Sequence, residues 1–205
     1  MTNQPTTRAG RPRGSSRAML EEAAAELFLE QTYAGTTIEE ITRRAGVSRN
    51  TFFNYFPAKS DLLWVDIDAG LAGLPRALDA CSPDLPVTDA VRSALLSVAA
   101  GFGPRNVPWA LTQDELMGTT GELAASALSR FMVYSGKLAD FVGKRAELPK
   151  DAVLCQGFTS AVLASAAAAA GVWARAGVSR GILAPFVDAT ITPVCEGYRT
   201  ALCSG

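Results

Sequence analysis

The chain has 205 residues, 48% of them hydrophobic, so it can bury one good core or one core plus a small second domain. The absence of histidine excludes Ser-His-Asp and Cys-His catalysis and most zinc sites. The formal net charge is −1, and the cysteines at 81, 155, 195 and 203 have neither metal-binding nor redox spacing, so neither a metal nor a cofactor is expected.

Residues 1–14 are predicted to form a flexible basic arm. Its arginines lie among prolines and glycines with no acidic residue, a composition that cannot bury a core. The segment Gly10–Gly14, GRPRG, resembles the core of an AT-hook, in which Arg11 and Arg13 would enter the minor groove of A·T-rich DNA. A solubilising tail explains the same composition equally well. No apolar stretch follows these basic residues, so a cytoplasmic protein without a signal peptide is expected.

Residues 15–60 are predicted to form a three-helix domain. The first helix, about 16–30, carries the apolar stripe Leu20, Ala23, Ala24, Leu27 and Phe28. A second, short helix starts at Thr37, which forms a capping box with Glu40, and it ends before Gly46. A third starts at once from the N-cap Ser48. Two short helices so close together form a helix-turn-helix, whose second helix enters the major groove of DNA.

The second helix of this motif has two kinds of side chain. Phe52 and Phe56 lie four residues apart and should pack on the first helix. On the preceding helix, Arg43 and Arg44 are expected to form a solvated face or to pair with Glu39 and Glu40. The outward-facing residues of the second helix are Arg49, Asn50, Thr51 and Asn54.

The run GVSRNTFFNYFPAKSDLL, Gly46–Leu63, resembles the signature of the TetR family of bacterial transcriptional regulators, and the preceding TTIEEITRRA fits it as well. Two positions depart from the family pattern: Phe53 stands where tyrosine is usual, and Ala58 where a small hydroxyl residue often caps the next helix. By this resemblance Arg49, Asn50, Thr51 and Asn54 lie near base edges, whereas Thr37, Phe53, Tyr55 and Lys59 lie near phosphates.

Residues 61–205 are predicted to be a second, helical domain, which makes the whole chain all-α with about nine helices. A helix from about Ala58 to Leu74 should join the two domains and break near Gly70, Gly73 and Pro75, a plausible hinge. The later helices are expected at about 87–101, 108–117, 121–148, 151–175 and 178–202.

The uncharged segment Ala152–Ala174 is long enough to cross a bilayer. Alanine dominates it, and polar residues interrupt it, so we expect a helix buried in a dimer interface and no membrane association. The resemblance to the TetR family implies the same arrangement, a homodimer formed by the helices at about 151–175 and 178–203, which would place two recognition helices on a palindromic double-stranded operator.

The resemblance also implies an effector pocket in residues 61–205, which would be the effector-binding and dimerisation domain. The scarcity of charge within the apolar stripes favours a hydrophobic small molecule. The run Phe52–Leu71 is similar to actinobacterial members of the family associated with mycofactocin redox systems, which implies a fatty acyl-CoA. Candidate lining residues, each of which taken singly is better explained as ordinary core, are Trp109, Met117, Phe131, Tyr134 and Phe158.

No catalytic residue is predicted. The conspicuous carboxylate pairs, Asp66 with Asp68 and Asp114 with Glu115, have spacings at which helical side chains point in different directions. The chain is therefore interpreted as a sequence-specific transcriptional regulator, by family default a repressor released by its effector. A nonspecific DNA-binding protein, or a helical interaction protein without effector response, remains the alternative.

Overall fold

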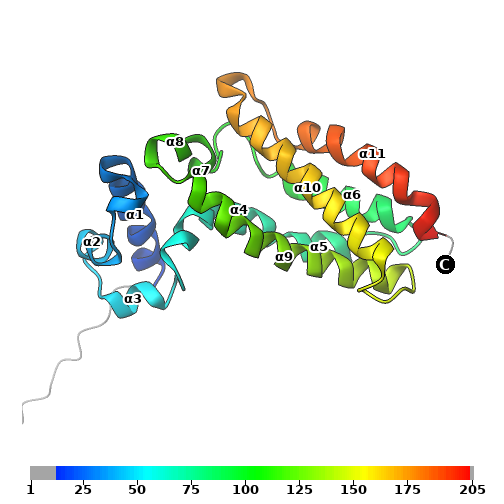
Figure 1. Cartoon of the computed structure of the whole chain (residues 1–205), viewed down its shortest axis with the longest axis horizontal. Helices are drawn as coiled ribbons and strands as arrows, with labels where there is room; N and C mark the ends of the chain where they lie inside the picture. The colour runs from blue at the N-terminus through cyan, green and yellow to red at the C-terminus, as the bar shows by residue number, and fades with distance from the viewer. Residues whose placement is uncertain (1–12, 204–205) are drawn as a thin grey trace, which may run out of the picture. The chain divides into compact units, whose positions relative to one another are not determined.

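The computed structural model in Figure 1 describes residues 13–203, and every regular element within them is a helix. The predicted all-α class is confirmed. These residues form two compact units: unit 1 comprises residues 13–62 and 115–119, and unit 2 comprises residues 63–114 and 120–203. Arg11 lies outside the described residues. Helix α1 already begins at Arg13, one residue before the predicted arm ends.

Unit 1 is built from α1 (Arg13–Gly35), α2 (Ile38–Arg44) and α3 (Arg49–Phe53). The predicted stripe of α1 packs against the other two helices, so the expected small core is confirmed. Buried together in this unit are Leu20, Ala23, Ala24, Leu27, Phe28, Ile41, Ala45, Phe52 and Phe56.

The end of α1 is interrupted by non-helical backbone at Gln31 and Thr32. Thr32 has φ 66° and ψ 164°, a region that glycine enters freely and a β-branched residue enters at a cost of about 1–3 kcal/mol. The break lets the buried Thr36 hydroxyl donate hydrogen bonds to the carbonyls of Leu27 (3.3 Å) and Thr32 (2.8 Å). Regular helix therefore ends at Glu30, as the sequence predicts.

Both helices of the helix-turn-helix start as predicted. The Thr37 hydroxyl accepts from the Glu40 backbone N–H (3.2 Å) while the Glu40 carboxylate accepts from that of Thr37 (2.8 Å). The Ser48 hydroxyl accepts from the backbone N–H of Thr51 (3.1 Å). Gly46, between the helices, has φ 65°, the left-handed conformation expected of it.

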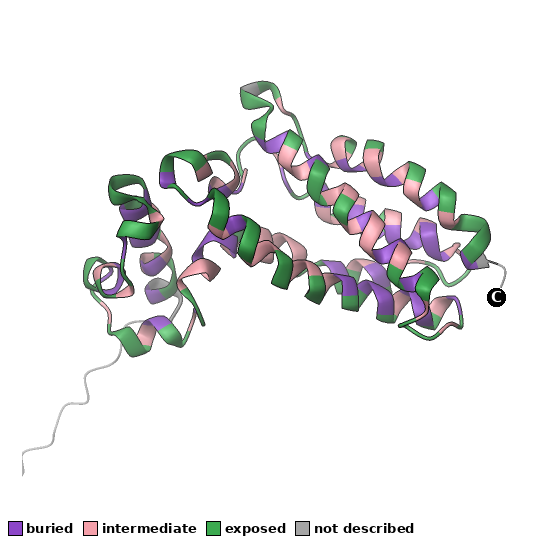
Figure 2. Ribbon diagram, in the orientation of Figure 1, coloured by how far each residue is buried: buried purple, intermediate pink, exposed green. Residues whose placement is uncertain are grey.

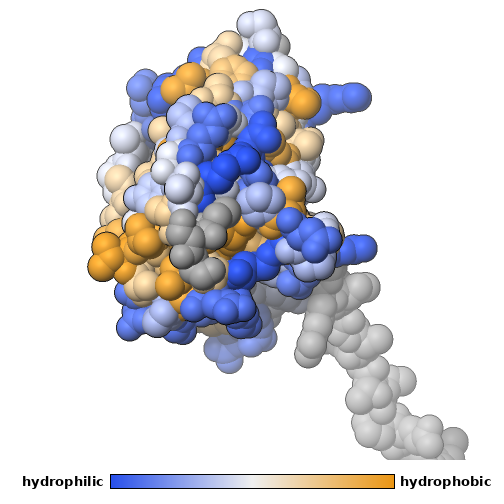
Figure 3. All heavy atoms as spheres, turned by 90° about the vertical axis from the view of Figure 1, so that its right-hand side faces the viewer, coloured by the Kyte–Doolittle hydropathy of each residue, from blue (hydrophilic) through white to orange (hydrophobic). Residues whose placement is uncertain are grey.

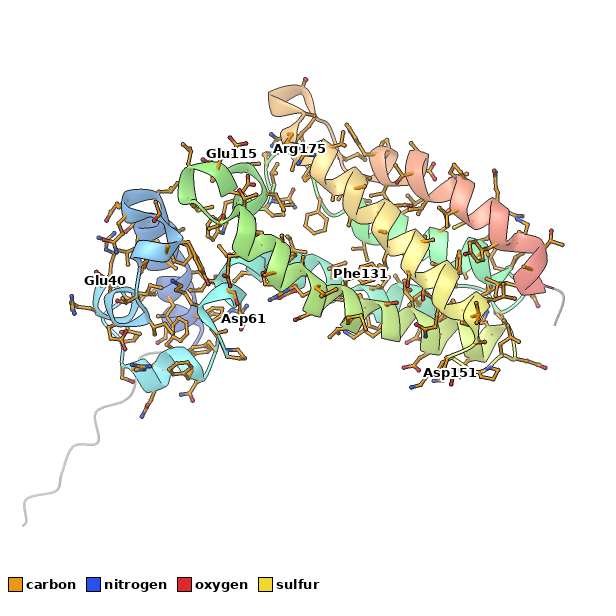
Figure 4. The ribbon with its side chains drawn as sticks, in the orientation of Figure 1. Glu40, Asp61, Glu115, Phe131, Asp151 and Arg175 are labelled. Carbon is orange, nitrogen blue, oxygen red and sulfur yellow. The ribbon has the colours of Figure 1, made fainter. Side chains whose placement is uncertain are left out.

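The predicted helix from 58 to 74 is divided into two pieces, a 3-10 helix η1 (Lys59–Trp64) and α4 (Val65–Leu71). A further short helix, α5 (Leu74–Asp79), follows the break. The Asp61 carboxylate, labelled in Figure 4, accepts from the backbone N–H of Ala58 (2.8 Å), so one half of a capping box forms although Ala58 has no hydroxyl. The break before Leu74 lies at the glycines and proline that predicted it.

After α5 the chain forms longer helices and three short helical elements. The predicted helix 108–117 is two pieces, because Gln113 leaves helical geometry. The predicted helix 178–202 starts late, after Gly181 at φ 63°, and it contains Pro193. The elements are α6 (Val87–Ala99), α7 (Trp109–Thr112), α8 (Asp114–Met117), α9 (Thr120–Arg145), α10 (Val153–Arg175), η2 (Gly177–Ser179) and α11 (Ala184–Cys203).

The core of unit 2 lies where α6, α9, α10 and α11 pack together (Figure 2). Its largest buried side chains include Trp173, Phe158, Leu138 and Ile191. Residues Glu115–Thr119 belong to unit 1 instead, with Gly118 beside Thr32 at the end of α1. No local sequence pattern predicts that these residues pack with unit 1, because the contact joins residues more than 80 positions apart.

Candidate functional site

The exposed face of α3 carries the side chains predicted to meet DNA. Arg49, Asn50 and Asn54 are exposed, and Thr51 is half-buried. Phe53 is 44% exposed although it is apolar, whereas its neighbour Phe52 is fully buried. The packing of Phe52 therefore fixes the rotation of α3 and turns the polar residues outward.

Arg49 is held in place by neighbours within unit 1. Its Nη1 donates to Oε1 of Glu39 on α2, and its guanidinium lies 5.5 Å from the ring centre of Phe53. Both partners of the ion pair are more than half exposed, so the pair contributes little to stability. Arg49 can leave Glu39 for a DNA base at low cost.

Lys59, expected near a phosphate, holds unit 1 together. Its ammonium donates to the carbonyls of Tyr33 (2.7 Å) and Thr36 (2.8 Å) and lies 3.9 Å from the ring centre of Tyr33. Two of its three protons thus bind the carbonyls at the end of α1. The lysine positions the segment between α1 and α2, including the exposed Thr37.

Arg44 fixes α2 to α1. Its guanidinium makes two 2.7 Å hydrogen bonds to the Glu30 carboxylate and reaches Glu26 at 3.5 Å. The hydrogen bond from Arg44 lowers the pKa of Glu30. The expected pairing with Glu39 and Glu40 is wrong for Arg44, because on this short helix its side chain turns back toward α1.

Unit 2 contains a cavity of about 350 Å³ lined almost entirely by apolar side chains. This is near the lower end of the range for small-molecule sites, about 300–1,000 Å³. Phe131, labelled in Figure 4, lines it from α9. Other aromatic lining residues are Trp64, Phe102, Tyr134 and Trp173.

Polar contacts of two lining residues, Trp64 and Arg130, join the η1–α4 segment to α9 beside the cavity. Arg130 donates to both carboxylate oxygens of Asp68 (2.9–3.2 Å) and stacks 4.7 Å from the ring centre of Trp64. The Trp64 indole N–H donates to the Ser126 hydroxyl (2.8 Å). Burial raises the pKa of the Tyr134 hydroxyl, and the Asp68 carboxylate raises it further against the opposing effect of Arg130, so the phenol is neutral near pH 7.

Comparison with known families identifies both parts of the chain. Residues 20–63 match the sequence model of the bacterial regulatory proteins of the tetR family. Residues 85–199, more than half of the chain, match that of the MftR C-terminal domain. The chain belongs to the TetR family. Its C-terminal region is of the MftR type, so the resemblance found from the sequence is confirmed.

Individual relatives agree with this assignment. The chain is 28% identical over 139 residues to the protein of Mycobacterium tuberculosis named as the mycofactocin biosynthesis transcriptional regulator MftR, covering 68% of this chain and 70% of the relative. It is 28% identical over 146 residues to the regulator TcmR of Streptomyces glaucescens, covering 71% and 60%. Thermus thermophilus FadR, a TetR-family repressor solved in complex with lauroyl-CoA, superposes with a TM-score of 0.56 at 25% identity, covering 88% of this chain and 94% of FadR.

As a TetR-family member, the protein is a DNA-binding transcriptional regulator, and proteins of this family are generally not enzymes. Within residues 13–203, no three histidine, cysteine, aspartate or glutamate side chains gather so as to hold a metal ion.

Two of the five predicted pocket residues of this TetR-family protein line the cavity, Phe131 and Tyr134. Trp109 is not among the lining residues. Met117 belongs to unit 1, and Phe158 is fully buried against Tyr198. Trp64 and Arg130 also line the cavity but were not predicted from the sequence. An arginine among the apolar positions of α9 is a signal that could have indicated a polar group in the lining.

Helix α10 is apolar but poorly covered. By length and composition it is the helix within residues 13–203 that could cross a membrane, yet a core helix passes the same test. Only 28% of its most apolar window is buried within the chain. Exposed residues run along α10 and α11 in Figure 2, and Figure 3 shows hydrophobic residues among hydrophilic ones on the surface of the molecule. TetR-family regulators dimerise, and these two helices offer apolar surface for it.

Proposed function

We propose that this TetR-family regulator is a cytoplasmic homodimeric repressor that binds a palindromic operator and is released when an apolar ligand of the acyl-CoA class fills the cavity of unit 2. The apolar cavity, with Arg130 in its lining bound to Asp68 of α4, is the observation that carries the proposal. The structurally similar FadR, crystallised with lauroyl-CoA, supports the ligand class.

For DNA binding, Arg49, Asn50, Thr51 and Asn54 are proposed to read base edges. Thr37, Phe53, Tyr55 and Lys59 would meet the sugar-phosphate backbone, and Arg11 and Arg13 the minor groove. Glu39 competes with DNA for Arg49, since the two side chains form an ion pair in the free protein. Replacing Glu39 with glutamine should therefore tighten operator binding, and Arg49→Ala should weaken it by about 1–3 kcal/mol.

For dimerisation, we propose the outer faces of α10 and α11. On α11 every fourth residue is small or proline and exposed, which lets a second helix approach closely: Pro185, Ala189, Pro193, Gly197 and Ala201. On α10, Ala164, Ala168 and Val172 repeat at the same spacing and are exposed as well. Light scattering should give twice the chain mass of 21.5 kDa, and Ala189→Glu should give the monomer. Ser129→Glu, on the exposed face of α9, is the matched control.

For release, a ligand in the cavity touches Trp64 and Arg130, which tie α4 to α9. A ligand that displaces Trp64 or Arg130 changes these contacts and moves α4. In the chain, α4 follows directly after η1, which leads from the DNA-binding unit. Ligand and DNA then oppose each other by thermodynamic linkage, provided that the ligand prefers the shifted state.

The test is capture of genomic DNA fragments by the purified protein, followed by sequencing and by titration with dodecanoyl-CoA. A recurrent palindrome released by dodecanoyl-CoA supports the proposal. Uniform capture of all fragments would mean a nonspecific DNA-binding protein, because a sequence-specific regulator discriminates by several decades of affinity. If the protein binds a recurrent palindrome but dodecanoyl-CoA does not release it, the protein is a sequence-specific regulator and the proposed acyl-CoA ligand is wrong.

A further inference from the structure

Phe102 separates two hollows of unit 2. One is the apolar cavity already described, and the other is a groove of about 670 Å³. The side chains of Phe102 and Val98 line both, so the two hollows lie on opposite sides of the same wall. Phe102 is only 8% exposed, although it borders the groove.

The ring of Phe102 rests directly on the backbone of α4 at Gly70. A Cβ atom at Gly70 would lie 2.1 Å from Cζ and 2.5 Å from Cε2 of the ring, so the ring would have to move if Gly70 carried a side chain. Gly70 therefore provides the space in which the ring sits. The ring can leave this place only by turning about its own side-chain bonds or by pushing α4.

The backbone around Phe102 is held in place, so its side chain is the movable part. The Phe102 carbonyl accepts from the backbone N–H of Leu183 (3.0 Å). Asn106 closes the loop by donating to the Gly101 carbonyl (2.6 Å) and accepting from the Gly103 backbone N–H (2.6 Å). A rotation of the ring would connect cavity and groove while the loop keeps its conformation.

The two hollows differ in chemistry. The cavity is lined by aliphatic and aromatic side chains, whereas the groove brings together Asp66, Ser97, Arg105 and Asn106. The groove has about twice the volume of the cavity and faces solvent. An apolar chain suits the first, and a bulky polar head that accepts hydrogen bonds from Arg105 suits the second.

We infer that Phe102 is a gate: an amphiphilic ligand passes its apolar chain from the groove into the cavity as the ring turns away from Gly70, and leaves its polar head in the groove beside Arg105. The inference rests on the proposed binding of an apolar ligand in the cavity. To the proposed function it adds the route by which the ligand enters and the site of its head group. It also adds a second contact between ligand and α4, because the ring that the ligand displaces packs on that helix.

The experiment follows ligand binding by stopped-flow tryptophan fluorescence, because Trp64 and Trp173 line the cavity. The probes are dodecanoyl-CoA, which has the bulky polar head, and dodecanol, which lacks it. Phe102→Ala should raise the association rate of both probes by about tenfold or more, as expected when a conformational step that limits binding is removed. Arg105→Ala should weaken dodecanoyl-CoA about fivefold, the loss of one exposed charged contact, and leave dodecanol unchanged.

The matched control is Phe141→Ala, which removes a half-buried ring of unit 2 that lines neither hollow. If Phe102→Ala binds both probes at the rate of this control, the gate is wrong. If Arg105→Ala affects both probes equally, the head does not lie in the groove. If neither probe binds the unaltered protein, the ligand cavity of the proposed function is wrong, and the gate is overturned with it.

Discussion

The two units hold their helices in different ways. In unit 1 the two helices of the helix-turn-helix are short, and hydrogen bonds between neighbouring residues set where they begin, as with Thr37 and Glu40 or Ser48 and Thr51. In unit 2 the long helices α6 and α10 have no side-chain cap, and apolar packing between distant segments holds them together. Unit 1 is thus specified locally and unit 2 by contacts between residues remote in sequence.

This difference suits the two tasks. A surface that reads DNA needs side chains fixed to within a fraction of an ångström, which caps and ion pairs around a small core provide. A unit that responds to a ligand needs an interior with two possible arrangements, and a cavity bordered by Phe102, Trp64 and Arg130 leaves room for them. Four substitutions test this comparison.

The largest effect is expected at the core of unit 1. Phe52→Ala removes a fully buried ring and should destabilise unit 1 by about 3–5 kcal/mol, abolishing operator binding. Because unit 2 has a core of its own, it should still bind dodecanoyl-CoA with unchanged affinity. Circular dichroism during urea unfolding, together with ligand titration, checks both statements.

Phe53→Ala is the matched control for Phe52→Ala, since this ring is 44% exposed. It should weaken DNA binding without changing the unfolding curve. Loss of ligand binding in Phe52→Ala would show that the two units fold as one, and the comparison would fail.

The next effect concerns the ion pair between Asp68 and Arg130 in unit 2. Asp68→Asn removes the charge that Arg130 binds with two nitrogens and should cost about 1–2 kcal/mol in the free energy of unfolding, since the Asp68 side chain is partly exposed. Because this ion pair joins α4 to α9, the variant should also release operator DNA at a lower ligand concentration than the unaltered protein. Thermal unfolding and ligand-dependent DNA release give the two readings. Asp79→Asn, an exposed carboxylate on α5, should change neither.

A smaller effect, of opposite sign, is expected at Thr32. Thr32→Gly should stabilise unit 1 by about 1 kcal/mol, because the strain of the positive φ exceeds the entropy that glycine adds to the unfolded chain. The hydrogen bond lost, from the Gly35 N–H to the Thr32 hydroxyl, is long at 3.4 Å. A lower midpoint of urea unfolding than that of the unaltered protein would contradict this account.

The same division explains which features could be predicted from sequence. The caps, the left-handed Gly46 and the burial of Phe52 and Phe56 follow from residues within a few positions of one another. Ala58 shows the limit even there, because the hydrogen bond from its backbone N–H to the Asp61 carboxylate was not predicted. In unit 2 the helices were mostly predicted, but which aromatics meet at the cavity depends on how α4, α6, α9 and α10 pack. Trp64, Phe102 and Arg130 come together across up to 66 positions, and no local pattern records that.

The smallest effect is expected at the capping box of α2. Hydrogen bonds from the Thr37 backbone and hydroxyl lower the pKa of Glu40 in the folded protein. A carboxyl whose pKa is lowered by folding contributes stability above its unfolded pKa, and this contribution is lost as the pH falls through the folded value. The stability of unit 1 should therefore fall below about pH 4.3, the ordinary pKa of glutamate.

Glu40→Gln should flatten this part of the profile of unfolding midpoint against pH. Glu147→Gln, an exposed glutamate of unit 2, should leave it as it is. An unchanged slope in Glu40→Gln would show that Thr37 holds the start of α2 without the carboxylate, and the local specification of unit 1 would then rest on its hydroxyl caps alone.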